Sequence, residues 1–353
     1  MANTYRYFMS ANGYGGFTSI YDSIQKEAGT LYVLKGGPGC GKSGFMKRIG
    51  SACTKSGVDV EYIHCAGDPD SIDGVIIPEL GCAFADGTRP HVLEPDIAGC
   101  TGGYIDLGAF CDSGEIAECR GEIEALEKER QRMVKRAGAL VTAAGKAVEG
   151  VLSPLHTVRA IETAEKRAAG ISGREMKRSI KGKSGKTKHR YISAFTCRGL
   201  ITLADTVIKQ CDRIYTVDNR LGLGEYLLRY VSERAALRGY DTVTCMSPFE
   251  YGKPEALIVP GHFAVVTGQP EKYEAPYRHI RLDAAVNREL LEKERGRIKR
   301  AEKLRKEALV LAQGELASAK ALHDRIEEIY NPFVDFEGVA ALADRYAEGI
   351  LRR

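Results

Sequence analysis

The stretch from residue 36 to residue 43 has the residue types and spacing of a phosphate-binding loop. It reads Gly-Gly-Pro-Gly-Cys-Gly-Lys-Ser and fits Gly-x-x-x-x-Gly-Lys-Ser/Thr, the Walker A or P-loop pattern. Its glycines let the backbone curl so that successive N–H groups point at one anion, and the positive end of a following helix faces the same phosphates. Lys42 adds a mobile full charge and the Ser43 hydroxyl can bind magnesium, so we predict that ATP or GTP binds here with Mg²⁺. The residues expected to contact the nucleotide are Gly36, Gly37, Pro38, Gly39, Cys40, Gly41, Lys42, Ser43 and Gly44.

The segments around this loop favour a nucleotide site over a glycine-rich turn without function. Residues 31–34 read as a buried strand and residues 44–49 can form a helix, which gives the strand–loop–helix order that the mechanism needs. Residues 58–65 and 80–85 read as two further strands. Alternating strands and helices predict an α/β core whose parallel sheet is covered on both faces.

The third strand ends in Asp86, where a second magnesium ligand is expected. We interpret Asp86 as a Walker B carboxylate, although Asp86-Gly87 is also a common turn dipeptide. Gly87 stands where many motor-type ATPases carry a catalytic glutamate, which argues against fast hydrolysis by the chain alone. Arg89 is the strongest candidate for a further phosphate contact. The predicted catalytic residues are thus Lys42, Asp86 and Arg89, and the predicted metal ligands are Ser43 and Asp86.

Other polar side chains follow the strands at the end where ligands bind in α/β sheets. Each is more often an ordinary loop residue, but Glu61 and His64 could assist a water molecule or a hydroxyl group. The remaining members of this group are Asp68, Asp70, Thr88, His91 and Glu94.

The sequence also contains an internal repeat, because residues 10–48 match residues 193–231 at one constant offset. Two later segments match in the same order, 75–78 with 257–260 and 126–130 with 291–295. Three ordered matches predict a tandem duplication and hence two P-loop-like α/β cores. The paired glycines are Gly16 with Gly199, Gly39 with Gly222 and Gly41 with Gly224.

The second copy has lost the residues that would hold a nucleotide. Glu225 and Tyr226 stand where the first copy has its lysine and serine, and Gly268 stands in place of Asp86. A carboxylate repels a triphosphate, and a tyrosine obstructs the magnesium position. We therefore predict a degenerate core kept for packing, partner recognition or regulation.

Each core is followed by a long, charged helical region. Breaks at 150–154 and 331–332 predict a shorter returning helix in each region, and so two helical hairpins. We expect the hairpins to pack against each other or against a protein partner. In the first region, apolar residues at helical spacing form one stripe: Ile116, Ile123, Leu126, Met133, Ala137, Leu140 and Ala144.

These patterns divide the chain into five parts. A second Gly-Lys-Ser/Thr cluster, at 182–187, lacks the first glycine and a leading strand, so we assign it to a flexible basic linker. A nucleic-acid contact through this linker stays an alternative. The parts are residues 1–112 for the first core, 113–172 for its hairpin, 173–189 for the linker, 190–284 for the degenerate core and 285–353 for the second hairpin.

Composition excludes several other classes of protein. A formal net charge of +4 over 353 residues does not by itself indicate a nucleic-acid or membrane surface. No apolar run is long enough to span a bilayer and the first residues do not resemble a signal peptide, so we expect a cytoplasmic protein without membrane contact. The ten cysteines form no Cys-x-x-Cys pair and are expected to be reduced.

Three segments together resemble a bacterial family of tandem P-loop proteins. They are residues 34–43, the string His-Cys-Ala-Gly-Asp-Pro-Asp-Ser at 64–71, and Asp-Gly-Thr-Arg-Pro-His at 86–91. Members of this family are usually labelled ATPase or ATP-binding protein, with no assigned physiological role. The resemblance spans essentially the whole chain and implies ATP binding. Members often keep a Gly-Lys-Ser/Thr loop in both halves, and this chain departs from that pattern in its second half.

Three functions are compatible with these features. The first is slow hydrolysis that acts as a switch on the helical regions, and the second is a kinase for a small molecule or nucleotide. The third is a binding module without turnover. For the kinase, basic residues of the first helical region would form a lid, although a solvated helix face is the more ordinary explanation: Arg130, Arg132, Lys135, Arg136 and Arg159.

Overall fold

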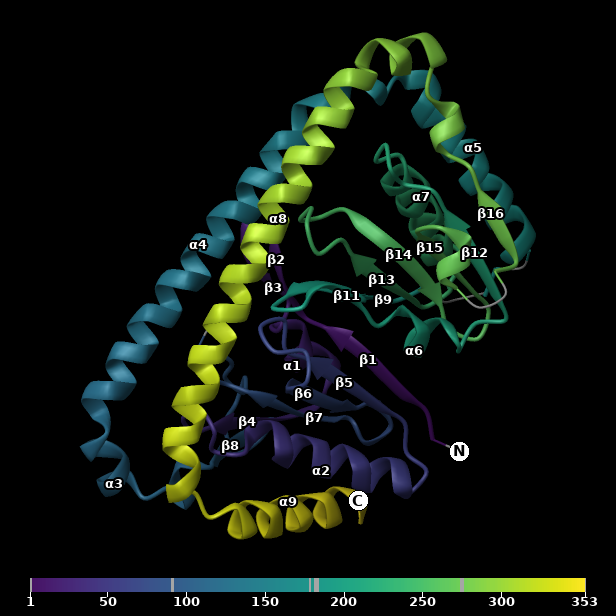
Figure 1. The fold of residues 1–353 in the computed structure, drawn as a ribbon. Coiled ribbons are helices and arrows are strands. Elements are labelled where there is room, and N and C mark those ends of the chain that lie inside the picture. Colours follow the sequence, from purple (N-terminus) through teal and green to yellow (C-terminus); the bar gives the residue numbers. More distant parts are fainter. Residues whose placement is uncertain (1, 90–91, 178, 181–183, 274–275, 353) are drawn as a thin grey trace.

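The computed structural model describes residues 2–89, 92–177, 179–180, 184–273 and 276–352 (Figure 1). The first half contains β1 (Thr4–Phe8), β2 (Ser10–Gly13), β3 (Gly16–Ser19), α1 (Ser23–Glu27), β4 (Thr30–Lys35), α2 (Lys42–Lys55), β5 (Val60–His64), β6 (Ile72–Ile77), β7 (Cys82–Asp86), β8 (Gly102–Asp106), α3 (Ser113–Glu118), α4 (Arg120–Leu152) and α5 (Val158–Glu175). The second half contains β9 (Thr187–Arg190), β10 (Ser193–Thr196), β11 (Gly199–Thr202), α6 (Ala204–Ile208), β12 (Arg213–Val217), α7 (Gly224–Leu237), β13 (Thr242–Met246), β14 (Pro254–Val259), β15 (Phe263–Thr267), β16 (Arg278–Ile280), α8 (Arg288–Tyr330) and α9 (Phe336–Leu351).

Two six-stranded sheets form the centre of the protein, and they share one topology. The first has the order β1-β5-β6-β7-β4-β8, and the second has the order β9-β13-β14-β15-β12-β16. In each sheet, one inner strand, β6 or β14, is antiparallel to both of its neighbours. All the remaining strand pairs are parallel. An α/β fold with two sheet cores and flanking helices is therefore confirmed.

The prediction of a parallel sheet is wrong, because both sheets are mixed. The chain leaves β5 and returns in β6 after only residues 65–71, and β7 follows β6 after residues 78–81. A parallel connection needs a crossover of a dozen or more residues, so these short connections permit only antiparallel neighbours. The predicted strands at 31–34, 58–65 and 80–85 correspond to β4, β5 and β7, whereas β6 was recognised only as part of the repeat.

The inner faces of the two sheets share one buried cluster with the short helices α1 and α6. Alternate residues of β4 and β7, such as Val33 and Ala85, share a buried cluster with Ile258 and Val266 of the second sheet. The intervening residues of β4 and β7, such as Leu34 and Phe84, point to the opposite face, which packs against helices. The helices α2, α9, α5 and α7 therefore pack on the outer faces of the sheets, and α1 and α6 contribute to the cluster between the inner faces.

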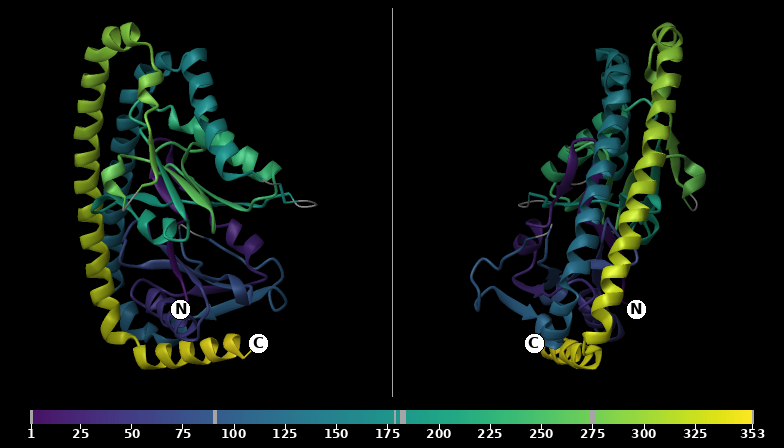
Figure 2. Two further views of the ribbon diagram at one scale, coloured as in Figure 1. Left: turned by 90° about the vertical axis from the view of Figure 1, so that its right-hand side faces the viewer. Right: turned by 60° about the vertical axis from the view of Figure 1, so that its left-hand side comes forward.

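The helical regions exchange partners between the halves. The long helices α4 and α8 lie side by side and antiparallel along one side of both sheets (Figures 1 and 2). The shorter helix α5 then packs on α7 of the second core, and α9 packs on α2 of the first core. Packing of the two regions against each other is confirmed, but each returning helix joins the core of the other half and does not close a hairpin on its own long helix.

A buried ion cluster also joins the halves. Arg190, only 1% exposed, lies on β9 and is bound by Glu27 at 2.5 Å and by Glu61 at 2.8 Å, both from the first half. Lys188 contacts the same two carboxylates. Residues 187–190 form β9 and thus belong to the second sheet. The predicted linker at 173–189 therefore includes the end of α5 and most of β9. Lys183 and the rest of 181–183 lie outside the described residues.

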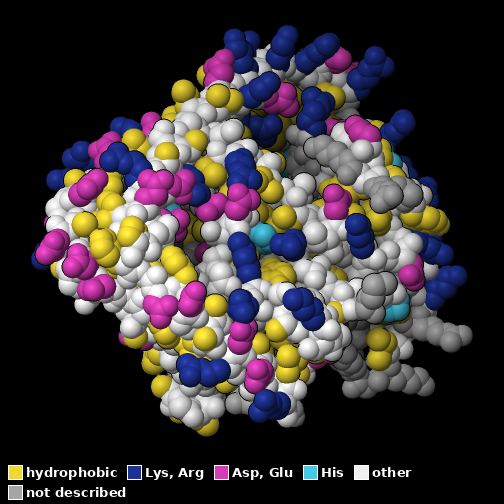
Figure 3. Space-filling view, turned by 60° about the horizontal axis from the view of Figure 1, so that its bottom comes forward, with side chains coloured by type: hydrophobic (Ala, Val, Ile, Leu, Met, Phe, Trp, Pro, Cys, Tyr) yellow, Lys and Arg dark blue, Asp and Glu magenta, His cyan; other side chains and the backbone are white. Residues whose placement is uncertain are grey.

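The surface nearest α9 carries both positive and negative side chains, with neither charge dominating (Figure 3). Figure 3 turns the underside of Figure 1 forward and shows acidic and basic side chains intermixed there. Among the described residues, no helix combines the length and the apolar composition needed to cross a bilayer.

Candidate functional site

The glycine-rich loop, residues 36–43, connects β4 to α2. Gly39 and Gly41 have φ values of 73° and 81°, in the left-handed region that favours glycine. Gly37 is needed for a different reason, because a Cβ there would lie 2.6 Å from the ring of Tyr330. The loop conformation therefore requires the glycines that the sequence pattern singled out.

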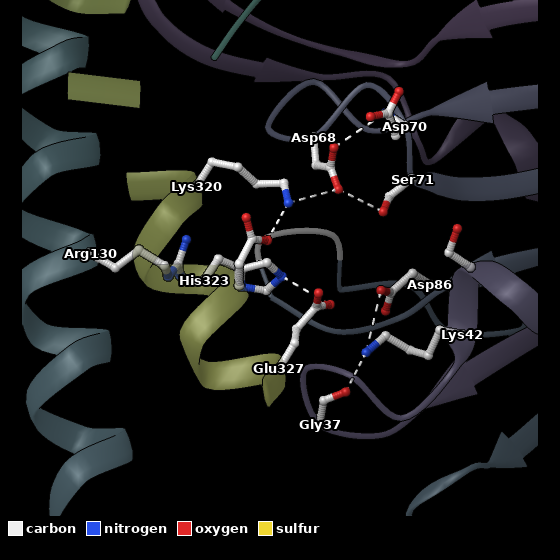
Figure 4. A network of polar contacts seen from close by, with 12 residues as sticks. Gly37, Lys42, Asp68, Asp70, Ser71, Asp86, Arg130, Lys320, His323 and Glu327 are labelled. Carbon is white, nitrogen blue, oxygen red and sulfur yellow. Dashed lines mark hydrogen bonds and ion pairs between the residues drawn. The ribbon is translucent and has the colours of Figure 1, made fainter. Parts of the chain in front are cut away.

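Lys42 lies across the mouth of this loop. Its Nζ donates to the carbonyl oxygens of Gly36 at 2.9 Å and Gly37 at 2.8 Å, and it lies 3.8 Å from Asp86 Oδ2 (Figure 4). The ammonium group is thus held by neutral carbonyl oxygens and one carboxylate that is not in close contact. A phosphate that binds this ammonium group must replace these contacts.

The sheet register brings Asp86 to the loop. Asp86 pairs with Leu34, so it lies beside the strand that leads into the loop. Its Oδ1 accepts hydrogen bonds from the Thr88 N–H at 2.8 Å and hydroxyl at 2.7 Å, which leaves Oδ2 facing Lys42. Ser43 is the second residue of α2, and its Oγ accepts a hydrogen bond from Ile72 N–H at 3.0 Å. Lys42, Ser43 and Asp86 are therefore close to one another, as the sequence predicted.

Sequence reasoning missed a second buried carboxylate. Asp73, on β6, is hydrogen-bonded to Tyr21 and Cys65. Burial, followed by the negative charge of Asp86, raises the pKa of Asp73 to about 7. A carboxyl group with such a pKa can exchange protons near neutral pH, as a general base must. Asp73 lies near Asp86 because β6 runs antiparallel between β5 and β7. No sequence motif identifies Asp73 as a site residue.

Residues of α8 from the second half complete the site, and the sequence gave no signal for them. Glu327 lies against the loop, because a Cβ on Gly39 would lie 3.3 Å from the Glu327 backbone. The pKa of Glu327 is lowered first by a hydrogen bond from His323, which outweighs the opposite effect of burial, then by the charges of His323 and Lys320, and least by Gly39 N–H. Lys320 also contacts Asp68 at 3.4 Å, which links α8 to the 65–71 connection (Figure 4). A carboxylate therefore lies close to the N–H groups that the phosphates were expected to use.

Asn331 and α9 press on the loop from the same side. A Cβ on Gly39 would lie 3.1 Å from Asn331 Oδ1, and a Cβ on Gly41 would lie 3.3 Å from Val339. Inside the loop, Cys40 is buried and its Sγ lies 2.9 Å from Cys111 Sγ. The loop is thus enclosed by its own half and by the far end of the chain.

Several predicted site residues are not brought to the loop. Arg89 is exposed and has no hydrogen bond or ion pair with any described residue. Glu61 belongs to the Arg190 cluster, and Asp70 pairs with Arg198. Pro90 and His91 lie outside the described residues.

His64 and Glu94 are occupied elsewhere. Burial lowers the pKa of His64, whose ring nitrogens contact Pro69 O at 2.8 Å and Arg6 Nη1 at 2.9 Å. Glu94 contacts Tyr104 and, at 3.6 Å, Lys35. Neither side chain is bonded to a residue of the glycine-rich loop.

The basic residues proposed as a lid do not gather at the site. Arg130 approaches the site from α4, where it is bound to Glu127 at 2.7 Å (Figure 4). Arg132 pairs with Glu129, and Arg136 pairs with Glu315 of α8. These pairs stabilise the helical regions, and of the five only Arg130 appears in the group of polar side chains around Glu327.

The corresponding loop of the second half is filled by side chains from both halves. Glu225 pairs with Lys253 at 3.1 Å, and the ring of His156 binds Leu221 O at 2.7 Å. A Cβ on Gly222 would lie 3.1 Å from His156 Nε2. His156 follows α4 of the first half, so this loop too is covered by the opposite half of the chain.

The chain matches no protein-family model, no curated protein and no solved structure.

Proposed function

We propose that the glycine-rich loop binds the phosphates of a magnesium nucleoside triphosphate, with ATP as the expected nucleotide. The observation that carries this proposal is the position of Lys42, held at the loop mouth by two carbonyl oxygens and facing Asp86. This arrangement leaves a mobile ammonium group beside a helix N-terminus and a loop of N–H groups, which is the set of donors that a phosphate chain needs.

The residues present suit a magnesium ion only if the nucleotide supplies further ligands. Among the described residues, no group of three or more His, Cys, Asp or Glu side chains could hold a metal ion. Ser43 Oγ and Asp86 Oδ2 are hard oxygen ligands of the kind that Mg²⁺ prefers, and Mg²⁺ in such sites is usually completed by phosphate oxygens and water. When bound, the ion would neutralise phosphate charge.

Binding would act as a switch because Glu327 lies close to Gly39, where the phosphates are proposed to bind. Repulsion between a bound phosphate and the Glu327 carboxylate favours displacement of this side chain. Glu327 lies near the end of α8, which extends along both halves and packs on α4. Nucleotide at the loop would thus shift the helical pair, and slow hydrolysis would restore the first state.

A tandem duplication of the bacterial P-loop kind is part of the same proposal. Support comes from the equal strand order and strand directions of the two sheets, together with the reciprocal exchange of α5 and α9. The loss of lysine and serine in the second loop, and the packing of His156 into it, support one nucleotide site per chain.

Binding of labelled ATP and GTP to the purified chain with Mg²⁺ tests the proposal. We expect Lys42→Ala to weaken binding by about tenfold to a hundredfold, because it removes a charge-assisted contact. Lys55→Ala, at the exposed end of α2, is the matched control and should bind as the wild type does. Equal binding by the wild type and Lys42→Ala would contradict the site.

Product analysis separates the modes of action. Slow phosphate release without an acceptor supports the switch. Labelled product that forms only with an added acceptor supports a kinase in its place, and tight binding with neither outcome supports a module that holds nucleotide without turnover.

A further inference from the structure

A cavity of about 790 Å³ lies on the second half, away from the glycine-rich loop. One wall is the face of α5 that carries Lys166, Arg167, Ile171 and Arg174, at the spacing of three and four residues that places side chains on one side of a helix. The other wall is β16 and the segment that follows it. In Figure 1 these two elements lie side by side at the right of the molecule.

The lining is strongly basic. Five side chains carry full positive charge, and no Asp or Glu lines the cavity. The chain as a whole has a net charge of only +4, so this concentration is local. The five are Lys166, Arg167, Arg174, Arg278 and Arg281.

Most of these charges have no acidic partner. Within the described ranges, Lys166, Arg167, Arg278 and Arg281 form no ion pair, although Glu175 at the end of α5 pairs with Arg213 on β12. Like charges gathered on two walls repel each other, and Glu175, at the end of α5, is already bonded to Arg213. An anion bound between the walls would remove this unfavourable energy.

Other features define the size and chemistry of that anion. The volume falls in the range of about 300–1,000 Å³ that is typical of small-molecule sites. Ile171 and Ile280, 1% and 8% exposed, form an apolar floor, and four of the five cations are arginines, whose planar forks match phosphate oxygens. An apolar floor below an arginine-rich rim suits a ligand with an organic body and more than one phosphate.

We propose that this cavity is a second anion site, which binds a small molecule carrying two or more phosphate groups. It is separate from the glycine-rich loop, because α5 and β16 cover the second core whereas the loop lies in the first. The degenerate half then has a ligand of its own, bound at the outer edge of its sheet and not at its filled loop.

Inorganic tripolyphosphate is the probe, measured by calorimetry with the full-length Lys42→Ala variant so that the glycine-rich loop contributes little. We expect saturable binding with one equivalent per chain that weakens steeply with salt. Adding Arg167→Glu and Arg278→Glu, both at exposed positions, should weaken it at least about tenfold, because charge-assisted hydrogen bonds are lost. The matched control adds Arg159→Glu and Lys306→Glu, which reverse two exposed charges outside the cavity and should leave binding within about twofold.

Three outcomes would overturn the proposal. Absence of binding at millimolar tripolyphosphate would show that the cavity is not an anion site. An equal loss in the two double reversals, with equal melting temperatures, would show attraction to overall charge only. A single-stranded oligonucleotide that binds more tightly than tripolyphosphate, with the same dependence on Arg167 and Arg278, would identify a nucleic-acid backbone as the ligand and not a small molecule. None of these results depends on whether nucleotide binds at the first loop.

Discussion

Replacing Glu327 by glutamine should strengthen nucleotide binding at the glycine-rich loop. Glu327 lies beside Gly39, where phosphate is proposed to bind, so its carboxylate repels the arriving anion. Repulsion between two unit charges about 4 Å apart ranges from about 1 kcal/mol in water to about 4 kcal/mol near a protein surface, and the lower end applies because 37% of the Glu327 side chain is exposed. Since 1.4 kcal/mol is a factor of ten in affinity, the glutamine variant should bind ATP about ten times more tightly.

The assay is equilibrium binding of a fluorescent ATP analogue with Mg²⁺ at moderate salt, supported by calorimetry with ATP. Glu328→Gln is the matched control, because this exposed neighbour on the same helix removes the same charge. The control should change affinity little. Unchanged or weaker binding by Glu327→Gln would refute the reasoning, and weaker binding would indicate that the carboxylate assists the nucleotide and does not compete with it.

Two further predictions concern the buried charges. Arg190→Ala leaves the two carboxylates of Glu27 and Glu61 with only the longer contacts to Lys188, so urea denaturation should show a loss of about 3 kcal/mol, and a loss below about 1 kcal/mol would mean that water already screens the cluster. Burial raises the pKa of Glu255, on β14, to about 8 in the folded chain against an ordinary value of 4.5, so the folded state binds the extra proton and wild-type stability should fall as pH rises from about 5 to 8. Glu255→Gln stays neutral and should gain about 2 kcal/mol over the wild type by pH 9, since part of this residue still reaches solvent; thermal melts from pH 5 to 9 that run parallel for both proteins would contradict this.

The elements closest to the glycine-rich loop could be predicted because their signals are local. An apolar run before the loop, glycines within it and a helix-forming segment after it lie within about twenty residues, and β4 and α2 form where they were expected. The position of Asp86 followed from the same reasoning, since adjacent parallel strands end together. Arg89 was chosen for its charge and for its place after the strand that ends in Asp86, but its side chain is exposed and no described residue holds it toward the loop.

The mixed direction of the sheets was missed although the chain contained the information. Connections of seven and four residues around β6 cannot cross a sheet, so their length alone decides an antiparallel pairing. Asp73 was missed with it, because its place beside Asp86 exists only when β6 lies between β5 and β7.

By itself, the sequence determined the local features: the strands and helices, the glycine-rich loop, and the replacement of lysine and serine in its second copy. Only the tertiary structure decided which surfaces meet. An apolar stripe predicts that one face of a helix is buried, but it does not indicate which core covers that face. The exchange of α5 and α9 between the halves could therefore not be derived from periodicity. Glu327 reaches Gly39 across almost 290 positions of sequence for the same reason, because contacts between distant segments are fixed by the packing of whole helices and sheets and not by the residues next to them.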